Sequence, residues 1–414
     1  MRYDNSLVQN ELKKEQMEVI FDRVPWFVYL LMFLKEAKVK HNLNVTDAII
    51  KSGTPIRVGV LKSFYDISEF DFVNKSIMEH LIGVKPSVSD IEEIISKSLS
   101  EGFISKDQIN RSSIDFSIAV AHFGVARINY ARSDTSLILN IRYLDYMVPD
   151  FDVVDYPNYY VDFISSIPQT KEIKLNERSL LHRTVGKNGL IIHAGPTGSG
   201  KTTAIASEIG YIASNINGLV ITYEEPIEYR FITELNVLQF EVDRDIKREE
   251  VKRHALRNNP SVIVWGEIRE ASEFRDVLDI ATRGHLVITT MHAGNVYEVL
   301  KFASSVLSEA EIGNFASLMQ AIVVHRLLIN STGRPVTLFE ILTNNKKLSS
   351  LLLDMRDPLK LKGIYNMMYD ATKGEKIEGF VSFEEFALFR KQQGKLNADE
   401  YMQFVKSLKY TLVG

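Results

Sequence analysis

The distribution of apolar residues divides the chain into two halves. Up to about residue 150, short helical stretches alternate with runs in which apolar and polar residues partly alternate, as in strands with one covered face. These runs are residues 56–60, 116–121, 125–130 and 137–142. The pattern predicts an N-terminal α+β domain over residues 1–150.

From residue 189 the predicted strands are apolar on both faces and are separated by helical stretches. They are residues 190–194, 219–223, 262–265 and 286–290, with a last strand at 336–342. Buried parallel strands covered by helices have this pattern. We therefore predict an α/β domain over residues 173–345, followed by a C-terminal helical region over 346–414.

Two segments do not fit either pattern. Residues 151–172 mix prolines with aspartates and are predicted to be a linker. The apolar run Val24–Leu34 is about half the length of a bilayer span and follows a polar start of mixed charge. We expect a helix there, buried in the protein or docked on a partner.

Composition narrows the classes of function. The 414 residues carry Lys+Arg 49 against Asp+Glu 53, a net charge of −4, so no overall field attracts nucleic acid. The chain has no cysteine, which excludes disulfides, thiolate zinc sites and cysteine nucleophiles. With no signal peptide or membrane span predicted, we expect a cytoplasmic protein.

A phosphate-binding loop follows the first buried strand of the second half. Residues 195–202 match G-x-x-x-x-G-K-[ST] at every fixed position, between a strand and a helix-forming run. Inward backbone N–H groups and the helix N-terminus would hold phosphates, Lys201 would neutralise their charge, and the Thr202 hydroxyl would bind Mg²⁺. The predicted nucleotide-binding residues are Gly195, Pro196, Thr197, Gly198, Ser199, Gly200, Lys201, Thr202 and Thr203.

Acidic residues follow two other predicted strands. Glu267 comes at the end of the strand 262–265, and Glu224 follows the strand 219–223. Ligands of α/β proteins bind at the carboxyl ends of strands, so both residues are candidates to act on a metal or on water. His285 and His292 flank the strand 286–290; by pattern alone they could equally be core or surface histidines.

These pieces together resemble the secretion-type hexameric ATPases of type IV pili and of type II and type IV secretion, especially the PilT and DotB/TraJ groups. Residues 189–203 resemble the Walker A segment of that family and residues 221–229 its aspartate box. Residues 256–270 resemble its atypical Walker B element, and residues 284–292 its histidine box. The similarity extends over about residues 45–410.

The resemblance implies a RecA-like motor domain behind a PAS-like N-terminal domain, assembled as a homohexamer that binds ATP and Mg²⁺. It implies that Glu224 and Glu267 organise water and metal. Either glutamate could be the base; we choose Glu224 and place Glu267 with Thr202 at the metal. Two histidines and two arginines complete the implied site: His285 and His292 sense the γ-phosphate, and Arg127 and Arg142 reach the nucleotide from the N-terminal domain.

The chain also departs from the family pattern. Residues 125–129 lack the first arginine of the Arg-x-Arg-x-Asn motif, and His325 stands where members usually carry Gln. The A-I-R-N-L-I-R-E signature of retraction motors is not recognisable in residues 347–354, and the zinc module of many assembly ATPases needs cysteines that are absent here.

The resulting hypothesis is a Mg²⁺-dependent ATPase motor that powers pilus retraction or assembly, or type II or type IV secretion. The motor would be a peripheral protein at the cytoplasmic face of the bacterial inner membrane. It would work through a platform protein of that membrane. Two alternatives remain: a DNA-handling RecA-like motor of a conjugation system, and a nucleotide-gated structural hexamer with little turnover. The lack of a basic stripe with interleaved aromatic residues argues against the first alternative.

Overall fold

The computed structural model describes residues 14–39, 45–60, 63–70, 73–106, 108, 113–120, 124–144, 148–175, 178–231, 234–370 and 376–411. The chain forms two compact units, the first comprising residues 1–147 with 228–230, and the second comprising 148–227 and 231–414. Among the described residues, no helix has the length and apolar character needed to cross a bilayer.

The first unit is built on an antiparallel sheet of six strands in the order β3-β2-β1-β6-β5-β4. The predicted strands of this half are present, and β1 and β3 are additional. The strands are β1 (Val45–Lys51), β2 (Arg57–Val60), β3 (Ser63–Asp66), β4 (Ser113–Val120), β5 (Gly124–Arg132) and β6 (Leu137–Leu144).

Helices cover this first sheet and explain the apolar run near the start of the chain. The run falls in α2, where Phe27, Leu30 and Leu34 are fully buried in the core of the first unit, and α2 packs on β1 and β6. The expected helix is therefore a buried one. The helical elements are α1 (Lys14–Ile20), α2 (Pro25–Val39), η2 (Ile67–Phe70), α3 (Lys75–Met78) and α4 (Val88–Ser100).

The second unit contains an eight-stranded sheet in the order β11-β10-β12-β13-β9-β14-β15-β16. The strands from β11 to β14 are parallel, and β15 and β16 add antiparallel to the edge. Its strands are β9 (Gly189–Ala194), β10 (Val220–Glu224), β11 (Val237–Glu241), β12 (Val262–Ile268), β13 (Leu286–Met291), β14 (Met319–Ile329), β15 (Pro335–Thr343) and β16 (Phe380–Val381). This sheet confirms the predicted α/β fold, although β14 was not predicted.

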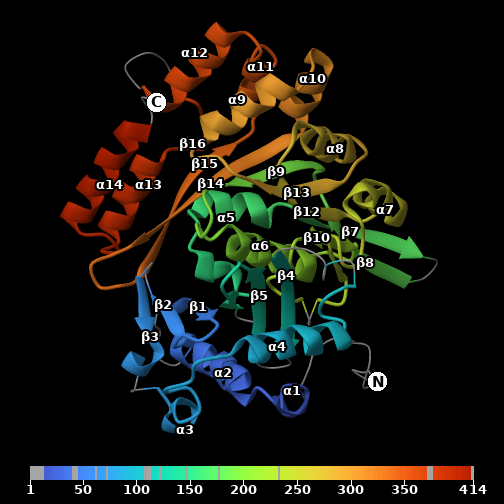
Figure 1. Cartoon of the computed structure of the whole chain (residues 1–414). Coiled ribbons are helices and arrows are strands. Elements are labelled where there is room, and N and C mark those ends of the chain that lie inside the picture. The colour runs from blue at the N-terminus through green and yellow to red at the C-terminus, as the bar shows by residue number, and fades with distance from the viewer. Residues whose placement is uncertain are drawn as a thin grey trace. The chain divides into compact units, whose positions relative to one another are not determined.

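Helices lie on both faces of the large sheet (Figure 1). The connection through α6 runs from β9 toward β10, and the one through α8 runs in the opposite direction, so right-handed crossovers put them on opposite faces. The helices between the sheet strands are α6 (Lys201–Asn215), η4 (Arg248–Glu250), α7 (Val251–Asn258), α8 (Ala271–Thr282), α9 (Val296–Val306) and α10 (Glu309–Leu318).

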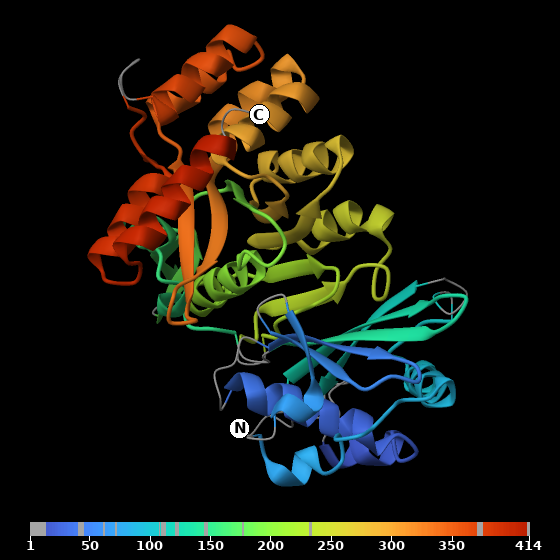
Figure 2. The same cartoon turned by 60° about the vertical axis from the view of Figure 1, so that its left-hand side comes forward.

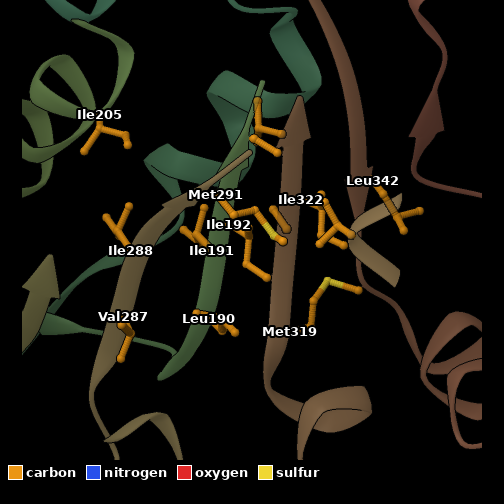
Figure 3. Packing of buried hydrophobic residues seen from close by; sticks show 14 of the residues in the cluster. Leu190, Ile191, Ile192, Ile205, Val287, Ile288, Met291, Met319, Ile322 and Leu342 are labelled. Atoms are coloured by element: carbon orange, nitrogen blue, oxygen red, sulfur yellow. The ribbon is translucent and has the colours of Figure 1, made fainter. Parts of the chain in front are cut away.

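The core of the second unit is apolar because its central strands are covered on both faces. All six residues of β9 are buried, among them Leu190, Ile191 and Ile192. Figure 3 shows these side chains beside Ile288 of β13 and Ile322 of β14. This rigid centre carries the loops at the carboxyl ends of the strands.

The C-terminal region is mostly helical, as predicted, with the short strand β16 between α12 and α13. Helix α13 packs against β15 and against α14, and Figure 2 shows these helices, in red, beside the long strands of the sheet edge. The elements are α11 (Lys346–Leu352), α12 (Pro358–Tyr369), α13 (Phe383–Gln392) and α14 (Ala398–Thr411).

The predicted linker over residues 151–172 differs from the structure. These residues form η3 (Phe151–Val154), α5 (Asn158–Ser165) and the start of a hairpin of β7 (Pro168–Leu175) and β8 (Arg178–Val185). Tyr160 and Ile164 are fully buried in the core of the second unit. The prolines flank α5 rather than mark a loose connection, because Pro157 is its N-cap residue and Pro168 begins β7.

Candidate functional site

The glycine-rich loop of residues 195–202, the P-loop, joins β9 to α6. Gly195, Gly198 and Gly200 have φ values of 143°, 76° and 90°, in the region that disfavours side chains. A Cβ atom on Gly195 would lie 2.6 Å from the carbonyl oxygen of His325 and 2.7 Å from Ser199 Oγ. Glycine at position 195 is therefore required both by backbone conformation and by close packing.

The P-loop has the chemistry of a phosphate site. Lys201 Nζ donates hydrogen bonds to the carbonyl oxygens of Gly195 at 2.7 Å and Pro196 at 3.1 Å, which places its ammonium group within the loop. Helix α6 presents its positive N-terminal end there. Ser199 Oγ is buried and has no hydrogen-bond partner among the described residues. These groups fit the phosphates of a nucleotide.

The predicted acidic residues lie at the same edge of the sheet as the P-loop. Met291 at the end of β13 pairs with Ala194 of β9 on one side and with Ile268 of β12 on the other. The next residue, His292, therefore follows the strand that lies between the P-loop strand and the strand of Glu267. The carboxyl ends of three neighbouring strands bring these groups together.

Glu267 is held by two donors. Its Oε1 lies 2.8 Å from Nε2 of His292, and its Oε2 accepts a hydrogen bond from Nε of Arg269 at 2.8 Å. The side chain of Glu267 is 23% exposed, so the carboxylate remains accessible to water. With both oxygens engaged, its orientation is fixed.

Glu224 ends β10, which neighbours β12 on the side away from the P-loop strand. Its Oε1 accepts hydrogen bonds from Thr222 Oγ1 at 2.6 Å and from Gln239 Nε2 at 3.0 Å. Tyr223 of β10 pairs with Trp265 of β12, so Glu224 and Glu267 end adjacent strands. The structure thus brings together the P-loop, His292, Glu267 and Glu224.

Two arginines at this edge were not among the predicted site residues. Arg269 lies with Nη1 3.1 Å from Glu225 Oε2, and Arg248 pairs with Glu225 and, at 2.9 Å, with Glu273. The bond to Glu267 is the main cause that raises the pKa of Arg269. The sequence signal was present, since Arg269 follows Glu267 by two residues, but its pairing with Glu225 depends on the sheet.

His285 does not lie in this site, so the prediction that it senses the γ-phosphate does not agree with the structure. Its carbonyl oxygen accepts a hydrogen bond from the backbone N–H of Gly189, the first residue of β9, whereas the P-loop follows the last. The imidazole is buried, with Nδ1 2.6 Å from the carbonyl oxygen of Pro260. His285 therefore lies at the amino edge of the sheet, across its full length from the P-loop.

The two predicted arginines belong to the first unit. Arg127 on β5 and Arg142 on β6 are directly opposite each other across the strand pair. Nε of Arg142 donates to Asp47 Oδ1 at 2.9 Å. Side chains directly opposite in an antiparallel pair share one face of the sheet. Their reach to a nucleotide stays a prediction.

The site offers a metal ion the single hydroxyl ligand that is typical of a P-loop. The described residues contain no group of three or more His, Asp or Glu side chains placed to hold a metal ion. A P-loop Mg²⁺ needs no such group, because it is held by one hydroxyl, nucleotide oxygens and waters. Thr202, the second residue of α6, offers that hydroxyl.

Known proteins resemble this chain in sequence and in fold. Residues 163–348 match the model of the type II/IV secretion system protein family. The type IV pilus ATPase PilU of Pseudomonas aeruginosa is 38% identical over 33% of this chain and 36% of its own length. The matched segment therefore spans about a third of PilU.

Solved structures extend the similarity to nearly the whole chain. The pilus retraction motor PilT with bound ADP aligns with a TM-score of 0.66 and 25% identity, over 89% of this chain and 96% of PilT. The ATPase DotB of Legionella pneumophila shares the fold, with a TM-score of 0.68 and 19% identity over 96% of this chain and 97% of DotB. Residues 163–348 therefore belong to the type II/IV secretion system protein family, and the chain as a whole has the fold of the ATPases PilT and DotB.

Proposed function

We propose that this protein is a Mg²⁺-dependent ATP-hydrolysing motor that works as a homohexamer and powers a type IV pilus or a type II or type IV secretion system. The observation that carries the proposal is the sheet edge, where the P-loop, His292, Glu267 and Glu224 follow neighbouring strands. Support for the cellular role comes from the similarity to proteins named as a pilus ATPase and a pilus retraction motor.

The proposed chemistry divides the work among these residues. Lys201 and the N-terminus of α6 hold the phosphates, and Thr202 would hold the Mg²⁺, which would supply charge stabilisation. Glu224 takes a proton from the attacking water. Glu267, whose two oxygens are already bonded to His292 and Arg269, orients water near the metal and keeps His292 directed at the terminal phosphate.

We further propose that Arg127 and Arg142 act as the arginines that stabilise charge on the transferred phosphoryl group. Such a cation lowers the barrier only if it reaches the nucleotide, which links turnover to the arrangement of the two units. Motion of the first unit during hydrolysis would be passed to a platform protein of the inner membrane, with the motor peripheral to its cytoplasmic face.

The test is ATP turnover measured alongside the mass of the particle by light scattering, with and without Mg·ATP. The expected result is a particle of six chains whose turnover falls at least about tenfold in Glu267→Gln. A particle that binds ATP without turning it over would instead favour a nucleotide-gated structural role. Stimulation by single-stranded DNA with strong salt dependence would favour a DNA motor.

A further inference from the structure

Three buried polar residues lie behind the P-loop and take no part in the proposed chemistry. They are His193 on β9, Glu208 on α6 and His325 on β14, and all three are fully buried. Burying two imidazoles and a carboxyl group is costly unless they bond to one another. Their arrangement therefore needs a physical reason.

The three side chains form a continuous hydrogen-bonded chain. His193 Nδ1 lies 2.8 Å from His325 Nε2, and His193 Nε2 lies 3.2 Å from Glu208 Oε2. In the tautomer of His193 that donates to Glu208 through Nε2, Nδ1 accepts a hydrogen bond from Nε2 of His325. This assignment leaves Nδ1 of His325, which has no partner among the described residues, as a bare acceptor rather than a buried unpaired donor.

This chain of bonds connects the elements that meet at the P-loop. His193 precedes Gly195 by two residues, and Glu208 follows Lys201 by seven, which is two helical turns along α6. The P-loop joins β9 to α6, and the bond from His193 to Glu208 joins the same two elements behind it. His325 connects β14 to the same group of bonds. Its backbone carbonyl oxygen lies so close to Gly195 that a Cβ atom there would be 2.6 Å away.

The surroundings favour the neutral form of the His325 imidazole. Burial is the main cause that lowers the pKa of His325 well below its usual value, and the neighbouring His193 and Lys201 lower it further. On the far side, burial and then the charge of Glu208 raise the pKa of Tyr156 and of Tyr160. Phe339 packs edge-on against the ring of His325.

We propose that His193, Glu208 and His325 form a brace that fixes the angle between β9 and α6 and so positions the P-loop backbone and Lys201 for the nucleotide phosphates. The three are positioning residues, since each acts through the P-loop. The proposal rests on nucleotide binding at the P-loop. It assigns affinity for the diphosphate to side chains that never touch it.

The test measures the binding of Mg·ADP by calorimetry, below the melting temperature of every variant. His193→Leu removes both bonds and fills the space with an apolar side chain, and we expect the affinity for Mg·ADP to fall on the order of tenfold. His325→Leu should also weaken binding, whereas His325→Gln keeps an N–H group that can donate to His193 and should stay within about twofold. His285→Gln is the matched control, since His285 is buried at the amino edge of the same sheet.

The outcomes separate positioning from general stability and from failure of the nucleotide site. Rescue by Gln but not by Leu at position 325 is expected in affinity, whatever the order of the melting temperatures. Folded His193→Leu that binds Mg·ADP like the wild type would overturn the brace. If His193→Leu does not fold, the two His325 variants decide, and equal affinity of both would overturn it. A wild-type protein that does not bind Mg·ADP would instead overturn the nucleotide site itself.

Discussion

Nε2 of His292 lies 2.8 Å from Oε1 of Glu267, although the two residues belong to different strand ends. His292 follows β13 and Glu267 lies near the end of β12, next to it in the sheet. The contact exists because parallel strands end at one edge, and it ties a histidine to the carboxylate proposed to orient water. It makes the two side chains a unit whose parts can be tested together.

Removing both members of this pair is expected to cost little more than removing one. Glu267→Gln and His292→Gln should each lower kcat at least about tenfold, and the double variant should show strong non-additivity, because bonded residues share their effect. Steady-state ATP turnover of the four proteins gives the coupling. If the fold-decrease in kcat of the double variant equalled the product of the two single fold-decreases, the residues would act independently and the joint role would be contradicted.

Replacing the P-loop lysine should nearly abolish ATP turnover without unfolding the protein. In Lys201→Ala the phosphates lose the ammonium group that lies within the loop, and turnover should fall to a few per cent or less. The control is Lys187→Ala, an exposed lysine just before β9 at the opposite edge of the sheet. Substantial turnover by Lys201→Ala, with Lys187→Ala like the wild type, would remove the assignment.

The proposed arginines should separate hydrolysis from binding. Arg127→Ala and Arg142→Ala are expected to lower kcat by about 10²-fold or more while Mg·ADP still binds, because a transition-state cation contributes little to the ground state. Arg132→Ala is the matched control, being an exposed arginine at the end of β5. If all three variants turned over ATP equally, the arginine assignment would fail.

The buried carboxyl group of Glu340 predicts a pH dependence of stability. Burial raises its pKa from 4.5 to about 7, while its Oε1 accepts bonds from the Val296 N–H and the Tyr369 hydroxyl. The folded state therefore holds a proton that the unfolded state has lost between these values. Stability should fall as pH rises from about 4.5 to 7 and lose no more from this group above that.

The variant Glu340→Gln keeps an acceptor oxygen but cannot ionise. Above pH 7 it should be more stable than the wild type by up to about 3 kcal/mol, and near pH 4.5 the difference should vanish. Denaturant unfolding at several pH values measures this, with Glu378→Gln as a control. A constant difference between wild type and variant across the range would show that Glu340 does not titrate on unfolding.

Local patterns in the sequence were sufficient for much of the site. The spacing of Gly195, Gly200 and Lys201 specifies a phosphate loop because the turn and the helix start depend on neighbouring residues. Four apolar residues before Gly266 predicted a buried strand that delivers Glu267 to the sheet edge, and β12 does so. These features depend only on residues that are close together in the sequence, so the sequence alone is enough to predict them.

Tertiary structure alone decided which distant residues meet. His193 and His325 are 132 positions apart, and their hydrogen bond requires β14 to lie beside β9. Strand β14 was not predicted from the sequence. His285 and His292 flank one strand, yet the length of that strand separates them to opposite edges. Residues 151–172 have the composition of a linker, but Tyr160 in this segment is buried in the apolar core of the second unit. The prediction failed because that core is formed by residues distant in the sequence. The sequence by itself determined the local chemistry of this protein, and packing, which is non-local, determined the partners of each group.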